Sequence, residues 1–126
     1  MNLPRDQFIS FKHALSGIYW AVRSQANFRI QLLLAIWALI LAVILKINFL
    51  EMAVLILTIF FVLICELINT SIEELTDLIT TKWLKQAKIA KDVSAGMVLL
   101  ASVGALFIAA VIFLPKILLL VEVIAY

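Results

Sequence analysis

Residues 52–77 read MAVLILTIFFVLICELINTSIEELTD, and this stretch decides the fold of the chain. Its first half is almost entirely apolar, as is typical of a helix that crosses a membrane. Its second half carries half of the eight acidic residues of the chain, namely Glu66, Glu73, Glu74 and Asp77. A charged side chain inside a bilayer is costly, so carboxylates that continue an apolar helix require a functional explanation.

The composition of the whole chain agrees with a membrane location. The chain has 126 residues, of which 66% are hydrophobic, and its mean hydropathy is +1.19. Soluble domains are about 45–50% apolar, so this chain lacks the polar surface of a soluble domain. Its length fits one small domain. The single cysteine, Cys65, excludes an internal disulfide, and no feature indicates a nucleic-acid partner.

Apolar segments predict an all-α membrane protein with three transmembrane helices, at about residues 30–47, 50–72 and 92–114. Residues 73–91 would form a cytoplasmic connection, and residues 115–126 an apolar tail. Residues 1–29 would form an amphipathic helix on the membrane surface, because apolar side chains recur there at spacings of three and four. That apolar stripe comprises Phe8, Phe11, Leu15, Ile18 and Val22.

Basic residues indicate the orientation, because they prefer the cytoplasmic side of a membrane. They gather in the N-terminal part and in the second connection, at Arg5, Lys12, Arg23, Arg29, Lys82, Lys85, Lys88 and Lys91. We therefore expect a cytoplasmic N-terminus and an external C-terminus. Small residues at every fourth position, Ala101, Ala105 and Ala109, would let helices approach closely. They predict a homo-oligomer, or close packing within one chain.

The polar residues after the second apolar segment form one stripe on a helix. At about 100° per residue, Glu66, Asn69, Glu73 and Asp77 fall within an arc of roughly 80°. Glu66, the deepest, suits a general base, and Glu73, nearer water, suits a divalent cation. Asn69 between them could donate to a phosphate oxygen or orient a carboxylate. Alternatively, the stripe could simply join helices to one another.

The third apolar segment begins with two charged residues that could complete such a site. Lys91 could reach anionic groups near the carboxylates, and Asp92 could cap the helix that starts there. A phosphate-binding P-loop or Rossmann turn is excluded, since the chain has only three glycines and no GxxxxGK[ST] motif. These features leave three hypotheses: a membrane enzyme acting on a phosphorylated substrate, a proton- or ion-coupled transport subunit, and a membrane scaffold.

Two motifs resemble the prokaryotic integral-membrane diacylglycerol kinase and undecaprenol kinase family. They are ELINTSIEELTDLI at residues 66–79 and AKIAKDVSAGMVL at residues 87–99, and the likeness extends from FR at 28–29 to FLPKI at 113–117. The resemblance implies a homotrimer in the bacterial inner membrane, with active sites shared between neighbours. It also implies transfer of the γ-phosphoryl group of MgATP to the hydroxyl of a membrane lipid alcohol.

The resemblance implies a role for each residue of the site. Glu66 would be the catalytic base, Glu73 would bind Mg²⁺, and Asp77 would support the cytoplasmic end. ATP would be bound by Asn69, Glu73, Lys91 and Asp92. The lipid would be bound by Glu66, Phe28, Arg29 and Ala95. TSIE and FLPKI are more similar to undecaprenol kinases of the Gram-positive type, so undecaprenol is the expected acceptor and diacylglycerol the alternative.

Two positions depart from the family pattern. Gln25 stands where the family usually has a glutamate that is a second metal ligand, and an amide brings no charge to such a site. Lys82, Trp83 and Leu84 stand where the family usually shows a triplet like Glu-Tyr-His near the adenine.

Overall fold

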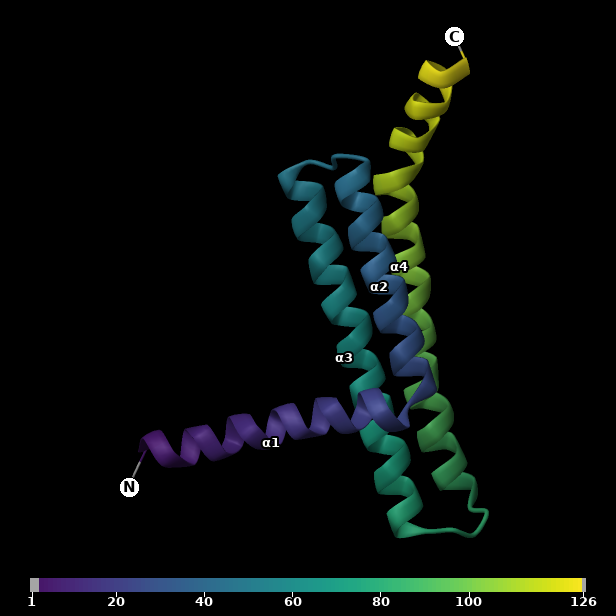
Figure 1. Cartoon of the computed structure of the whole chain (residues 1–126). Helices are drawn as coiled ribbons and strands as arrows, with labels where there is room; N and C mark the ends of the chain where they lie inside the picture. The colour runs from purple at the N-terminus through teal and green to yellow at the C-terminus, as the bar shows by residue number, and fades with distance from the viewer. Residues whose placement is uncertain (1–2, 126) are drawn as a thin grey trace.

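The computed structural model describes residues 3–125, with side chains from Ile9 onward, and this part of the chain is helical with short breaks. The helices are α1 (Leu3–Ser24), α2 (Ala26–Ile44), α3 (Phe49–Ile79) and α4 (Lys85–Ala125). Helices α2, α3 and α4 lie side by side as a bundle, and α1 projects from it at a steep angle (Figure 1). The all-α prediction is confirmed.

Three helices, α2, α3 and α4, are long and apolar enough to cross a membrane, as predicted. Many of their large apolar side chains are exposed; for example, Trp37 is 66% exposed, Leu57 71% and Leu106 72%. Such a surface would be unfavourable in water, where monomeric proteins rarely expose large apolar patches. The length and composition of the three helices and this surface indicate a membrane protein.

The helices extend beyond the expected membrane-spanning segments. Helix α3 continues to Ile79, and α4 begins at Lys85, so only residues 80–84 separate them. Helix α4 is 41 residues long and passes through Pro115, which cannot donate a backbone hydrogen bond. Its final part extends past the ends of α2 and α3 (Figure 1). The limits of the membrane-embedded parts, the cytoplasmic connection and the tail stay predictions.

The prediction that Asp92 caps the third transmembrane helix is wrong. Helix α4 starts at Lys85, so Asp92 lies well inside it, and its carboxylate pairs with Lys88 one turn earlier. The residues before Asp92 explain the difference, because KQAKIAK consists of lysine, glutamine, alanine and isoleucine. All but isoleucine are among the stronger helix formers, so they extend the helix toward its N-terminus.

The end of the bundle at the α2–α3 turn is tightly organised. Lys46 has a positive φ of 50°, which reverses the chain after α2. The Asn48 side chain accepts a hydrogen bond from the backbone of Glu51 at 2.9 Å, and the Glu51 carboxylate accepts one from the backbone of Asn48 at 2.8 Å. This reciprocal capping box satisfies two donors at the start of α3. The Glu51 carboxylate also pairs with Lys116 of α4 at 3.0 Å.

An apolar core packs beneath this turn. It consists of buried side chains from α2, α3 and α4, namely Ala42, Leu55, Ile112 and Phe113. Ala109, from the stripe of small residues, packs against this core, and Ala101 is buried. The small residues of α4 therefore serve packing within one chain, which is one of the two alternatives above. The predicted homo-oligomer is a separate matter and stays a prediction.

The junction of α1 and α2 is held by Arg29 and Phe28. Gln25 between the helices has an extended backbone, with φ −100° and ψ 113°. The Arg29 guanidinium donates to the carbonyls of Val22 at 3.3 Å and of Arg23 at 2.9 Å, at the end of α1. Phe28 is buried at the same junction. These contacts fix the angle at which α1 leaves the bundle.

Helix α1 presents part of its apolar stripe on its surface. Phe11, Leu15 and Ile18 are exposed, while the side chain of Phe8 lies outside the described ones. That α1 lies on the membrane surface as an amphipathic helix stays a prediction.

Candidate active site

The carboxylate stripe of α3 begins near one boundary of the apolar part of the bundle. Since a helix rises about 1.5 Å per residue, Glu66 lies about 26 Å along α3 from Phe49. The hydrocarbon core of a bilayer is about 30 Å thick. With Phe49 near one face of the bilayer, Glu66 lies close to the other. On that placement, Asp77, about 16 Å further along the helix, would lie outside the hydrocarbon.

Glu66 is held by a residue from another helix. Its side chain is almost completely buried, with 3% of the residue exposed. Its Oε2 accepts a hydrogen bond from Nε2 of Gln31, in the second turn of α2, at 3.0 Å. The carbonyl Oε1 of Gln31 is buried and has no hydrogen-bond partner within residues 3–125. Glu66 is therefore a buried carboxylate with one fixed oxygen, and the neighbouring amide has a free acceptor.

The next turn of the stripe links α3 to α4 through Asn69. Its Nδ2 donates to Oε1 of Glu73 at 3.0 Å, and its Oδ1 accepts from the hydroxyl of Ser94 at 2.7 Å. The same hydroxyl lies 2.9 Å from the backbone carbonyl of Lys91, so these two acceptors compete for its single hydrogen. Both Asn69 and Ser94 are buried. These contacts fix which end of the Asn69 amide faces Glu73.

The last turn of the stripe forms an ion pair with α4. The Lys91 ammonium lies 2.5 Å from Oδ1 of Asp77. That Lys91 reaches further anionic groups near the carboxylates stays a prediction. Both side chains are partly solvated, with relative exposures of 37% and 62%. Asp92 points elsewhere and pairs with Lys88, and Ala95 is exposed. Phe28 and Arg29 stabilise the α1–α2 junction.

The predicted site residues therefore fall into two groups. Five of them follow one another along α3 and the facing side of α4 in three sets of contacts: Gln31–Glu66, Glu73–Asn69–Ser94 and Asp77–Lys91. Gln31 and Ser94 are additional members. The structure does not bring Phe28, Arg29, Asp92 or Ala95 into hydrogen-bond contact with that group. Their predicted roles toward lipid and nucleotide stay predictions.

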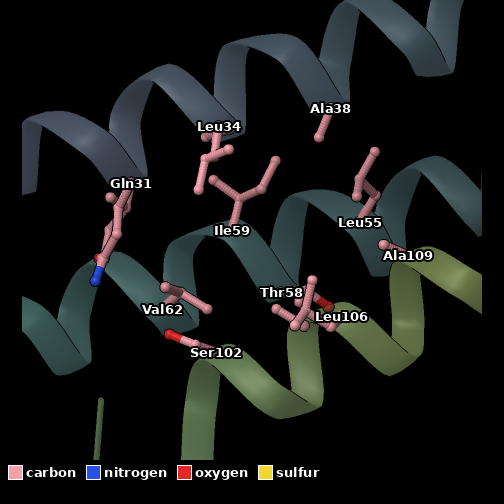
Figure 2. A pocket seen from close by; sticks show the side chains of 13 residues that line it. Gln31, Leu34, Ala38, Leu55, Thr58, Ile59, Val62, Ser102, Leu106 and Ala109 are labelled. Carbon is pink, nitrogen blue, oxygen red and sulfur yellow. The ribbon is translucent and has the colours of Figure 1, made fainter. Parts of the chain in front are cut away.

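An apolar cavity of about 380 Å³ adjoins Gln31. It lies between α2, α3 and α4, and Gln31 stands at one end of the residues that line it (Figure 2). Hydroxyl groups of Thr58 and Ser102 are the other polar side chains in the lining, which otherwise consists of aliphatic residues such as Leu34, Ile59 and Leu106. Ligand sites of this kind are mostly apolar with a few placed polar groups. The cavity suits a hydrocarbon chain whose polar end lies beside Gln31, the residue that contacts Glu66.

The donor groups of the site fit a magnesium ion that arrives with a nucleotide. Within the described part of the chain, no three His, Cys, Asp or Glu side chains gather in a way that could hold a metal ion by themselves. Mg²⁺ usually takes one or two carboxylates and completes its shell with water and substrate phosphates. Glu73 can supply such a carboxylate. Asn69 donates to one of its two carboxylate oxygens, Oε1, which leaves Oε2 for the ion. Gln25 makes no capping hydrogen bond with its side chain at the start of α2.

Two members of the site, Gln31 and Ser94, were missed as functional residues in the sequence. Gln31 is the only polar residue between Ile30 and Leu45, and a lone polar group in an apolar span signals a function. The sequence therefore contained a signal that could have identified Gln31. Ser94 follows Asp92 in a run of small residues that indicates room for a close approach, and nothing in that run predicts a hydroxyl bonded to Asn69.

The fold and the site together define a class of protein. It is a small membrane protein with three apolar helices, whose carboxylate, amide and ammonium groups line one end of the bundle beside an apolar cavity. Residues 12–113 match the family described as prokaryotic diacylglycerol kinase. The chain belongs to that family, which confirms the resemblance noted in its sequence.

Individual relatives have two different names. The chain is 38% identical over 111 residues to a diacylglycerol kinase of Synechocystis, covering 87% of this chain and 63% of that protein. It is 38% identical over 109 residues to an undecaprenol kinase of Bacillus subtilis, covering 86% and 89%. A Helicobacter pylori diacylglycerol kinase is 34% identical over 101 residues, covering 80% and 79%. The family and these names indicate a lipid kinase and do not distinguish the two acceptors.

Proposed function

We propose that this protein is an MgATP-dependent kinase of the bacterial inner membrane that phosphorylates the hydroxyl of undecaprenol. The observation that carries this proposal is the order of groups along α3. A buried carboxylate, Glu66, is bonded to Gln31, which lines an apolar cavity. Asn69, Glu73 and the Asp77–Lys91 pair follow further along α3, in the direction proposed to face water. A lipid hydroxyl and a nucleotide polyphosphate need these groups in that order.

In the proposed reaction, Glu66 acts as the general base. Its carboxylate removes the proton of the lipid hydroxyl while the hydroxyl oxygen forms a bond to the γ-phosphorus of ATP, and the bond from that phosphorus to ADP breaks. The electron pair of the broken bond leaves with ADP. Phosphoryl transfer depends mostly on positioning and on charge neutralisation, and general bases contribute about 10²- to 10⁴-fold to such rates.

The nucleotide would lie beyond Glu66, toward Asp77. The Asn69 amide and the Lys91 ammonium are donors that suit phosphate oxygens, and Asp92 lies on the next position of α4. Asp77 would support this end of the site by holding Lys91. Glu73 would hold Mg²⁺, which supplies charge neutralisation to the phosphates when bound. To bind a phosphate, the Lys91 ammonium would have to move away from Asp77 or contact both groups at once.

The lipid would enter from the bilayer, with the part of its chain nearest the hydroxyl in the apolar cavity. Phe28, Arg29 and Ala95 would complete the lipid site, as the family resemblance implies. Undecaprenol is preferred because the relative named undecaprenol kinase is covered over 89% of its length, whereas the Synechocystis diacylglycerol kinase is covered over 63%. Diacylglycerol is the second candidate acceptor, which the names of three of the relatives favour.

We propose the same assembly and orientation as the sequence predicts: a homotrimer with active sites shared between neighbours, an N-terminus in the cytoplasm and α1 on the membrane surface. The basic residues of α1 and of residues 82–91 support this orientation. Light scattering of the purified protein in detergent should give the mass of three chains. A single-chain mass in active protein would contradict the trimer.

The test of the reaction is an assay of purified protein with radiolabelled MgATP and either undecaprenol or diacylglycerol in mixed micelles. We expect phosphate transfer to both lipids to be measurable and kcat/KM to be at least tenfold higher for undecaprenol. A higher value for diacylglycerol would reverse the acceptor. If neither lipid accepts phosphate, and reconstituted vesicles show ion or proton movement instead, the protein is a transport subunit. If neither phosphate transfer nor ion or proton movement is measured, the membrane scaffold is the hypothesis that remains.

A further inference from the structure

The Gln31–Glu66 contact links the apolar part of α2 to the proposed base. Gln31 lies on a helix that is otherwise apolar from Ile30 to its end, and its side chain crosses to α3 to donate to Oε2 of Glu66 at 3.0 Å. The contact is partly buried. A hydrogen bond to an ionised carboxylate in such surroundings is roughly twice as strong as one between neutral groups.

The stability of the bundle does not explain this glutamine. Its carbonyl oxygen is buried without a hydrogen-bond partner in the described chain. A buried polar group left unpaired is destabilising, whereas an apolar side chain of similar size would fill the same space without that cost. A feature that costs stability and contacts a reactive group is expected at a functional site.

We propose that Gln31 is a positioning residue for Glu66. Its amide holds Oε2, so that the other oxygen, Oε1, faces the hydroxyl of the lipid and receives its proton. Gln31 itself contacts neither ATP nor the reacting atoms. This inference rests on the proposed function for its kinetic part, while the contact itself is a property of the protein without substrates.

The first test compares two glutamine variants in the full-length protein. Gln31→Met keeps the length of the side chain and removes the amide. We expect kcat to fall about tenfold to a hundredfold, because a charge-assisted hydrogen bond that orients the base is lost. The KM for ATP should stay within about twofold, and the loss should appear in kcat rather than in the KM for the lipid, because the Gln31 amide is engaged by Glu66. The control is Gln86→Met, at an exposed glutamine in the first turn of α4, which should leave all three constants unchanged.

Thermal unfolding in detergent distinguishes positioning from a structural role. We expect Gln31→Met to unfold within a few degrees of the unmodified protein, because removal of the unpaired carbonyl offsets the loss of the hydrogen bond to the buried Glu66 carboxylate. A lower unfolding temperature together with a normal kcat would mean that the glutamine serves to join α2 to α3. A raised KM for the lipid with a normal kcat would mean that Gln31 binds the lipid. Either result overturns the proposal.

The second test needs no activity. The chain has four glutamines, so selective ¹⁵N labelling of glutamine side chains gives few amide signals by NMR. We expect one proton of the Gln31 amide to lie downfield of its counterpart in Gln86, and this difference to vanish in Glu66→Leu. A Gln31 signal that resembles Gln86 in the unmodified protein would exclude the contact. If the contact is present and neither lipid is phosphorylated, the proposed function fails and the contact stands.

Discussion

The two ends of the α2–α4 bundle are joined by different kinds of contact. At the turn end, which comprises residues 42–55 and 109–116, the polar groups cap a helix start above an apolar core, and one ion pair, Glu51–Lys116, joins α3 to α4. At the site end, which comprises residues 66–77 and 88–95, side chains of α3 and α4 bond to one another.

This difference shows which polar groups the fold itself needs. The capping box of Asn48 and Glu51 satisfies backbone donors that any helix start leaves unpaired. Asn69, Glu73 and Ser94 satisfy no such backbone donor, and apolar residues could pack between α3 and α4 in their place. We infer that the turn end stabilises the bundle and that the site end performs the chemistry. Variants at the two ends test this division, because those at the site end should change catalysis and those at the turn end should change stability.

The largest effect is expected for Glu66→Gln. The glutamine keeps the size of the side chain but cannot remove a proton, so kcat should fall by about 10²- to 10⁴-fold. Light scattering should show the same oligomer as before. The matched variant is Glu51→Gln, a carboxylate of the same helix at the turn end, which should lower the unfolding temperature and keep kcat. A loss of assembly in Glu66→Gln would instead mean that the stripe joins helices.

A smaller effect is expected for Ser94→Ala. Without the hydroxyl, Oδ1 of Asn69 loses its partner and the amide is no longer held toward Glu73. Since a hydrogen bond is worth about 1 kcal/mol, we expect KM for ATP to rise up to about tenfold. Ser71→Ala is the control, because the Ser71 hydroxyl bonds only to its own helix, at the carbonyl of Leu67. Equal kinetic changes in both variants would contradict a specific role for Ser94.

Glu66 and Ser94 also show which parts of the site the sequence can predict. Periodicity along one helix was sufficient to place Glu66, Asn69, Glu73 and Asp77 on one face, and composition was sufficient for three apolar helices. Both are properties of local sequence.

Contacts between helices were harder to predict. The bonds of Gln31 to Glu66 and of Ser94 to Asn69 depend on how α2 and α4 are rotated against α3, and no short motif encodes that rotation. The start of α4 was mistaken because the apolar segment begins near Val93, while the helix-forming residues before it continue the helix outside the membrane.

At the turn end, Asn48→Ala should lower stability and leave catalysis unchanged. Loss of a side-chain cap costs about 1 kcal/mol, and the cap lost here is the hydrogen bond that Asn48 accepts from the Glu51 backbone. Unfolding of the purified protein in detergent should therefore begin at a lower temperature, with kcat and both KM values unchanged. Asn48→Ser keeps a capping oxygen and should retain most of the stability. A change in kcat would show that the two ends are coupled.

The smallest effect on stability is expected for the ion pair of Asp77 and Lys91 at the site end. Its side chains are 62% and 37% exposed, and pairs of this kind contribute roughly 0.2–1 kcal/mol to folding. A double-mutant cycle with Asp77→Asn and Lys91→Met should therefore give a coupling free energy of unfolding below about 1 kcal/mol. In the same variants, Lys91→Met should raise KM for ATP severalfold, since the ammonium is proposed to bind phosphate. A coupling well above 1 kcal/mol with an unchanged KM would place this contact with those of the turn end, as part of what holds the bundle together.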